Sequence, residues 1–159
     1  MTALFAIVRT ILVVAAFTWL WGAAALWARR FDSLFGMLPP WAPALGIAVL
    51  LAGVPLALTC AVLFAIRGKG TPAPFDPPRT FVAFGPYRVV RNPMYVGGWL
   101  TIVGVALILR STGIAALSLA AVACAHLFVI LYEEPTLTAK FGATYDQYRA
   151  TVPRWIPHL

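Results

Sequence analysis

Two short stretches of the sequence carry side chains that could do chemistry, and the first is Arg91-Asn92-Pro93. Asparagine followed by proline predicts a helix start, because asparagine is a common N-cap and proline suits the first helical position. Such a start presents free N–H groups and the positive end of the helix dipole next to Arg91. These groups together suit a carboxylate or a phosphate. Lipid phosphate at a membrane surface is the alternative partner.

The second stretch is the adjacent acidic pair Glu133-Glu134, which follows an apolar run and precedes Pro135. Two carboxylates at a helix C-terminus oppose the helix dipole and repel one another. A cation would offset both effects. That cation could be a protein arginine such as Arg91, or a ligand with ammonium or sulfonium charge and ribose hydroxyls. A solvated helix end is the simpler alternative.

The residues after this pair predict a short amphipathic tail. A helix over 135–141 should end at Gly142, and Thr144-Tyr-Asp-Gln147 has the spacing of a capping box that would start another. The last segment, 152–157, combines prolines with aromatic and basic side chains. We expect this tail to lie at the membrane interface, over the end of the helices that precede it.

The elements that must position these residues are membrane helices. Hydrophobic residues make up 62% of the 159 residues and charged residues 11%, whereas soluble domains have about 45–50% and about 25%. Four apolar runs approach the length of about 20 residues that a bilayer requires, and they cover residues 11–28, 41–66, 93–109 and 114–132. We therefore predict an all-α membrane bundle of four transmembrane helices. A cleaved signal peptide is the alternative for the first run.

The chain is too short for a separate soluble catalytic domain, so we expect one membrane domain over 1–159. Its first part, 1–66, supplies two spans. Its second part, 67–159, supplies a proline-rich strap before Tyr95, a helical hairpin turning at 110–113, and the tail. Any chemistry must then occur among the helices or just outside them.

The basic residues predict the orientation of the bundle. The net charge is +7, and the twelve basic residues are scattered between apolar runs rather than gathered as in a nucleic-acid-binding patch. A hairpin of the last two spans places 67–92 and 133–159 on the side of the N-terminus. That side carries nine basic residues against three, which favours the cytoplasm. Only the pair Arg29-Arg30 opposes this orientation.

The stretches GPYRVVRNPMYVGGW and EEPTLTAKFGATYDQYRATVPRWIP, in this order, resemble the isoprenylcysteine carboxyl methyltransferase and phospholipid methyltransferase superfamily in its small prokaryotic form. The resemblance covers roughly residues 75–157. It implies a methyltransferase in the bacterial plasma membrane that uses S-adenosylmethionine, requires no metal and acts on a lipid or lipophilic molecule. The cofactor residues that it implies are Tyr87, Arg91, Asn92, Pro93, Tyr95, Gly97, Glu133 and Glu134. It also implies catalytic roles for Arg91 and Glu134, and substrate contacts for Tyr145, Tyr148 and Arg154.

The resemblance also suggests how the site would work. Arg91 and the helix start would hold the carboxylate of the cofactor, and the two glutamates its ammonium or ribose. The acceptor could be a carboxylate, an amine or a thiol, and it would enter from the bilayer. Many members have histidine where this chain has Asn92, so a histidine base is not available at this position.

Two other functions fit parts of the sequence. Membrane sterol reductases that use NADPH resemble the tail, but they are normally much longer. A membrane scaffold that retained the fold without activity would bind neither cofactor. Binding of each cofactor separates the three hypotheses.

Overall fold

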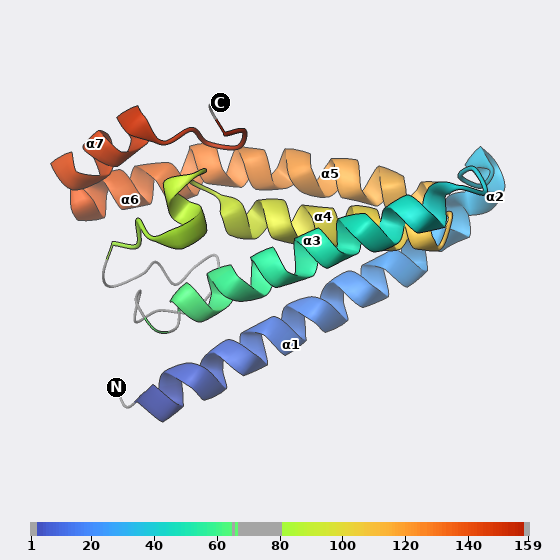
Figure 1. Cartoon of the computed structure of the whole chain (residues 1–159), viewed down its shortest axis with the longest axis horizontal. Coiled ribbons are helices and arrows are strands. Elements are labelled where there is room, and N and C mark those ends of the chain that lie inside the picture. Colours follow the sequence, from blue (N-terminus) through green and yellow to red (C-terminus); the bar gives the residue numbers. More distant parts are fainter. Residues whose placement is uncertain (1–2, 65, 67–80, 158–159) are drawn as a thin grey trace.

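The chain forms a bundle of helices that run alongside one another (Figure 1). The computed structural model describes residues 3–64, 66 and 81–157, so the first part of the predicted proline-rich strap, 67–80, lies outside the described residues. In chain order, the elements are α1 (Ala3–Ala28), η1 (Arg29–Phe31), α2 (Asp32–Phe35), α3 (Ala42–Leu63), η3 (Gly85–Arg88), α4 (Pro93–Ile108), α5 (Thr112–Phe128), η4 (Val129–Glu133), α6 (Glu134–Phe141) and α7 (Ala143–Thr151).

The lengths of these helices agree with a membrane bundle. Among the described residues, three helical stretches are long and apolar enough to cross a bilayer: Val8–Phe35, Ala42–Leu63 and Thr112–Phe141. The third predicted run, 93–109, forms α4, which has only 16 residues and is about 24 Å long at 1.5 Å per residue. A bilayer core is about 30 Å thick. The chain is thus an all-α integral membrane protein with three long apolar helices and a shorter fourth.

Helices α3 and α4 approach each other closely because glycines line their contact. Gly46 and Gly53 on α3 face Gly104 and Gly97 on α4. A Cβ atom at any of the four would lie 2.6–2.9 Å from an atom of the opposite helix, closer than van der Waals contact allows. Small residues at such a contact let two membrane helices pack backbone against backbone. The contact holds the N-terminal end of α4 beside α3.

The opposite end of the bundle is fixed by a carboxylate that caps α5. Oδ1 of Asp32 accepts hydrogen bonds from the Ser111 hydroxyl at 2.7 Å and the Gly113 backbone N–H at 2.8 Å. These bonds join the α1–α2 corner to the tight turn between α4 and α5. Gly113 also lies directly against the carbonyl of Ala28 at the end of α1. From this contact α1 diverges from α3 toward its own N-terminus (Figure 1).

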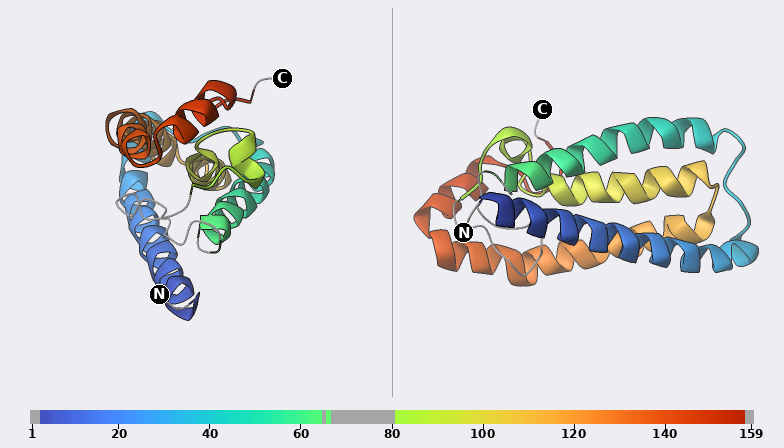
Figure 2. Two further views of the ribbon diagram at one scale, coloured as in Figure 1. Left: turned by 90° about the vertical axis from the view of Figure 1, so that its left-hand side faces the viewer. Right: turned by 90° about the horizontal axis from the view of Figure 1, so that it is seen from below.

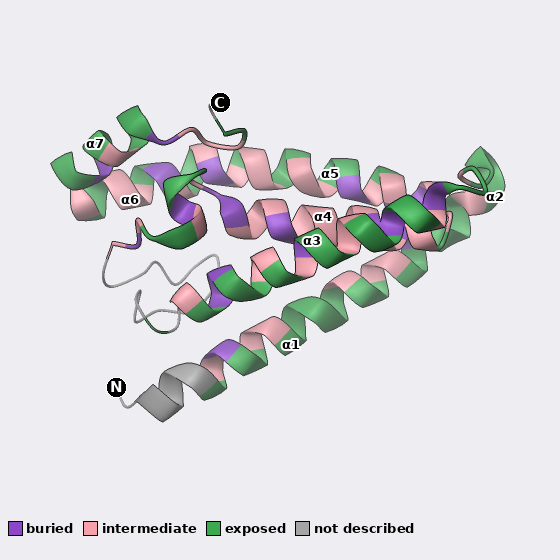
Figure 3. Cartoon of the chain, in the orientation of Figure 1, coloured by how far each residue is buried: buried purple, intermediate pink, exposed green. Residues whose placement is uncertain are grey.

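The polar end of the bundle gathers several distant segments. The N-terminal end of α1, the η3 segment, α6 and α7 all lie at this end, and two further views agree (Figure 2). The turn between α6 and α7 is made by Gly142, whose φ of 51° favours glycine. Buried residues also concentrate here and along the α3–α4 contact, whereas α1 is largely exposed (Figure 3).

Two neighbouring glycines of α4 allow a matched test of the α3–α4 contact. Replacing Gly97 with alanine should lower the free energy of unfolding by about 1–3 kcal/mol, because the new methyl group would overlap Ala57 of α3. Replacing Gly98 with alanine should be neutral or stabilising, since no atom lies within 4 Å of the added Cβ. Thermal unfolding of the two variants in detergent measures the difference, and equal midpoints would contradict this packing.

Candidate functional site

The start of α4 lies where the sequence predicts it, but its capping differs from the prediction. Asn92 is the N-cap residue and Pro93 the first helical residue. The Asn92 side chain makes no capping hydrogen bond. Instead, its Nδ2 donates to the backbone carbonyl of Arg154 at 3.2 Å. The side-chain amide therefore joins the helix start to the C-terminal segment.

The two glutamates lie where the long helix of the C-terminal half changes its winding. Pro135 cannot donate a hydrogen bond, and its ring displaces the carbonyl four residues earlier. The preceding turn, η4, is correspondingly wider: it is a π-helix in which the N–H of Glu134 donates to the carbonyl of Val129. Glu133 and Glu134 both line the same cavity from this turn.

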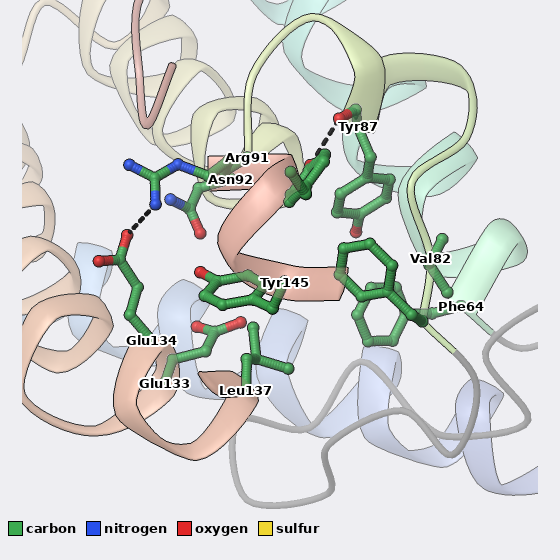
Figure 4. A pocket seen from close by; sticks show the side chains of 11 residues that line it. Phe64, Val82, Tyr87, Arg91, Asn92, Glu133, Glu134, Leu137 and Tyr145 are labelled. Carbon is green, nitrogen blue, oxygen red and sulfur yellow. Dashed lines mark hydrogen bonds and ion pairs between the residues drawn. The ribbon is translucent and has the colours of Figure 1, made fainter. Parts of the chain in front are cut away.

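Glu134 is the centre of an ionic cluster. Its carboxylate lies 2.9 Å from Nη1 of Arg91 and accepts two hydrogen bonds from Arg154, at 2.7 Å from Nε and 2.9 Å from Nη2. The side chains of Arg91 and Glu134 are only 11% and 12% exposed, so solvent screens their attraction little. The cation that the acidic pair was expected to require is thus supplied by two arginines, of which Figure 4 shows Arg91.

Backbone and phenol contacts hold the C-terminal segment, residues 152–157, against the start of α4. The N–H of Arg91 donates to the carbonyl of Pro153 at 2.8 Å. The hydroxyl of Tyr148 donates to the carbonyl of Tyr87, which joins α7 to η3. Burial raises the pKa of both Tyr87 and Tyr148 above the usual tyrosine value. Both phenols therefore stay protonated at neutral pH, and the Tyr148 hydroxyl remains a hydrogen-bond donor.

Glu133 has a different environment from its neighbour. Its Oε2 accepts a hydrogen bond from the Tyr95 hydroxyl at 2.9 Å. No cation of the described residues lies within ion-pair distance of its carboxylate. Tyr95 in turn contacts Trp155 edge to face, with ring centroids 6.3 Å apart. The indole N–H of Trp155 donates to Nδ1 of His126 on α5 at 3.0 Å.

These elements enclose a cavity between the start of α4, α6 and α7. Aromatic and apolar side chains form one wall and the charged groups the other (Figure 4). The lining residues are Phe64, Phe81, Val82, Tyr87, Arg91, Asn92, Glu133, Glu134, Leu137, Tyr145 and Tyr148. The cavity volume is about 40 Å³, which is room for a few water molecules. Pockets for drug-sized ligands measure about 300–1,000 Å³.

The residues around the cavity suit S-adenosylmethionine chemically, although the cavity is too small for it in this conformation. Two buried polar atoms, Oη of Tyr87 and Nε of Arg91, have no hydrogen-bond partner among the described residues. Buried polar groups are seldom left unpaired in proteins, so these atoms favour a polar ligand. The carboxylates suit an ammonium group or ribose hydroxyls, and the aromatic wall suits a base or a sulfonium. A molecule of that size would fit only if the C-terminal segment or α7 moved.

Most of the predicted site residues gather at this cavity, but not all in the expected way. Tyr87, Arg91, Asn92, Glu133, Glu134, Tyr145 and Tyr148 line it. Pro93 begins α4 beside the cavity, and Tyr95 reaches Glu133 from outside the lining. Gly97 faces α3, so its position indicates helix packing rather than cofactor contact. Arg154 binds Glu134, and its contact with a substrate stays a prediction.

A second local prediction is wrong, and several residues of the site were not predicted. The capping box at Thr144 does not form, because α7 begins at Ala143 with Gly142 as its N-cap and no side-chain cap. Phe64, Phe81, Val82 and Leu137 line the cavity, but their apolar types do not distinguish them from ordinary membrane or core residues.

Comparison with known proteins agrees with the sequence resemblance. A model of the family described as phospholipid methyltransferase matches residues 41–144, which is more than half of the chain. No curated protein matches the sequence. The matched region includes α3, α4, α5 and both glutamates.

Two arginines of the tail test the ionic cluster against an exposed pair. Arg154→Gln should lower the free energy of unfolding by about 1.5–3 kcal/mol, because hydrogen bonds to a charged partner are lost. It should also increase proteolysis of the C-terminal segment. Arg149→Gln should change stability by less than about 0.5 kcal/mol, since Arg149 pairs with Asp146 on the surface. If the two variants unfold alike, Arg154 does not hold the tail.

Proposed function

Because the chain belongs to the phospholipid methyltransferase family, we propose that this membrane methyltransferase uses S-adenosylmethionine and methylates an amine of a lipid or another amphiphile. The observation that carries the proposal is the difference between the two adjacent glutamates. Glu134 is neutralised by Arg91 and Arg154, whereas the partner of Glu133 is the neutral hydroxyl of Tyr95. One carboxylate at the cavity is thus left to attract a cation.

This charge pattern favours an amine over a carboxylate as the acceptor. A carboxylate acceptor would be repelled by Glu133, and the arginine that lines the cavity, Arg91, already contacts Glu134. An ammonium group would be attracted, and it must lose a proton before its nitrogen can act as a nucleophile. Glu133 is placed to accept that proton, while Tyr95 orients the carboxylate through the bond to Oε2.

S-adenosylmethionine, when bound, supplies a methyl group on a sulfonium: the C–S bond breaks as the C–N bond forms, and the electron pair stays on sulfur. The protein must align the acceptor with this methyl group, exclude water and take up the proton. We assign Arg91 to the cofactor carboxylate, and Glu134 to its ammonium or ribose. Because these two side chains contact each other in this structure, the ligand has to separate them. Tyr145 and Tyr148 close the cavity on the side of α7.

We also propose that the site faces the cytoplasm of a bacterial cell. The N-terminal end of α1, α6, α7 and the cavity share one end of the bundle (Figure 2). Basic residues are in excess on the segments of that end, as the positive-inside rule requires. S-adenosylmethionine is made inside cells, so the orientation places the site where its cofactor is available.

Calorimetric titration of the purified protein in detergent tests the proposal. S-adenosylmethionine and S-adenosylhomocysteine should bind, and NADPH should not. Glu134→Gln should weaken binding about tenfold or more, equivalent to at least about 1.4 kcal/mol. Asp146→Asn is the matched control, because Asp146 lies on the exposed surface of α7, and it should leave the affinity unchanged.

A second variant separates direct binding by Glu134 from an indirect effect on the tail. Arg154→Gln loosens the tail but leaves Glu134 free for the ligand, so its affinity for S-adenosylhomocysteine should be equal to or higher than that of the wild type. If Arg154→Gln and Glu134→Gln weaken binding equally, Glu134 acts only by holding the tail. If NADPH alone binds, the protein is a reductase; if nothing binds, it is a scaffold.

A further inference from the structure

A row of side chains leads from the cavity to the outer surface of the bundle between α4 and α5. Glu133 lines the cavity, and the hydroxyl of Tyr95, on α4, donates a hydrogen bond to the Glu133 carboxylate. Trp155 contacts the ring of Tyr95. Trp155 is itself held by His126 of α5 through the 3.0 Å hydrogen bond to Nδ1. The indole thus bridges the two helices at the point where the polar site meets the membrane-facing surface.

The surface next to this bridge is apolar and exposed. Leu127 is 55% exposed, Leu131 73% and Ile156 78%. The first two follow His126 along the same helical stretch, and Ile156 follows Trp155. In a membrane protein such side chains contact lipid. The chain of contacts from Glu133 through Tyr95 and Trp155 to His126 therefore ends beside exposed apolar side chains.

A second observation points to a ligand on the same face of α4. Trp99 lies four residues after Tyr95, which places the two side chains on one face of the helix, about one turn apart. Its indole N–H is buried and has no hydrogen-bond partner among the described residues. An unpaired buried donor is costly, so this N–H suits an oxygen of a molecule that lies along α4.

We propose that the acceptor reaches the site between α4 and α5, and that Trp155, held by His126, is the gate that sets which acceptors enter. This inference rests on the proposed methyl transfer and extends it to the route of the acceptor. Trp155 must leave Tyr95 for a lipid chain to pass, and the hydrogen bond to His126 opposes this movement. Trp99 then donates to an oxygen of the acceptor about one helical turn along α4 from Tyr95, the partner of Glu133.

Kinetics with two phosphatidylethanolamines test the gate. The acceptors are a soluble form with six-carbon chains and dioleoyl phosphatidylethanolamine in mixed micelles. Trp155→Ala should raise kcat/KM for the long-chain lipid relative to the short-chain lipid by about tenfold, a typical limit for discrimination by apolar contacts. The change should appear in KM for the acceptor, with the affinity for S-adenosylhomocysteine unchanged. Trp99→Phe should raise KM for both lipids about three- to tenfold, because one hydrogen bond is lost.

Variants of His126 distinguish a gate from a merely structural contact. His126→Leu removes the acceptor of the indole hydrogen bond, so it should shift the chain-length ratio in the same direction as Trp155→Ala, but less. His126→Gln retains an acceptor oxygen and should restore the wild-type ratio. If the ratio is unchanged in Trp155→Ala and His126→Leu, or changes only together with a loss of cofactor affinity, the gate is contradicted.

A crosslinking measurement tests the route without turnover. Phosphatidylethanolamine with a diazirine in its acyl chain is incorporated into micelles with the protein, irradiated, and the tryptic peptides are analysed. Labelling of peptide 92–110, which contains Tyr95 and Trp99, should increase in Trp155→Ala over the wild type. Peptide 10–29 of the exposed helix α1 is the internal control and should not change. Equal labelling of 92–110 in both proteins overturns the route, whereas a failure of the proposed function appears separately as absent cofactor binding.

Discussion

The paired charges around Glu134 connect the three segments from which the site is built. The carboxylate belongs to the end of a membrane helix, Arg91 precedes the start of α4, and Arg154 belongs to the C-terminal segment. A buried ion pair of this kind adds little net stability over apolar packing, but removing one partner leaves a charge uncompensated. The position of the tail and of α7 therefore depends on keeping Glu134 paired, and any ligand that binds there must replace the protein's own charges.

This dependence explains why the site is closed in the present structure. With Arg91 and Arg154 both on Glu134, the tail is drawn over the start of α4, and the aromatic side chains of α7 fill most of the space beneath it. A ligand that carries both a carboxylate and an ammonium can satisfy Arg91 and Glu134 separately. The same exchange would release Arg154 and with it the segment that carries Trp155. In the proposed function, the cofactor site and the acceptor route thus border the same short stretch of chain, residues 152–157.

The sequence predicts the main elements well because their causes are local. Apolar runs define the helices, Asn92-Pro93 defines the start of α4, and Gly142 defines the end of α6. Predictions of helix caps from a local pattern were less accurate, because another residue took the place of the expected partner. The Asn92 side chain binds the tail instead of capping its helix, and a glycine N-cap precedes the expected capping box of α7.

The pairing of side chains across the site could not be predicted from the sequence. The bond between Arg154 and Glu134 depends on the turn at Gly142, which reverses the chain by an amount that no residue pattern specifies. The hydrogen bond from Trp155 to His126 likewise depends on where the tail crosses α5. The role of Gly97 was also ambiguous in the sequence, because a glycine suits both a nearby ligand and a neighbouring helix. The position of α3 against Gly97 favours helix packing.

The most direct measurement is the location of the bound cofactor. The purified protein is irradiated with radiolabelled S-adenosylmethionine, and the crosslinked residues are identified by mass spectrometry, with excess S-adenosylhomocysteine as competitor. The account predicts competed crosslinks within 81–95 and 133–148, the segments that enclose the ionic cluster and the cavity. Crosslinks confined to the other end of the bundle, near Asp32 and Ser111, or crosslinks that the competitor does not suppress, would contradict it.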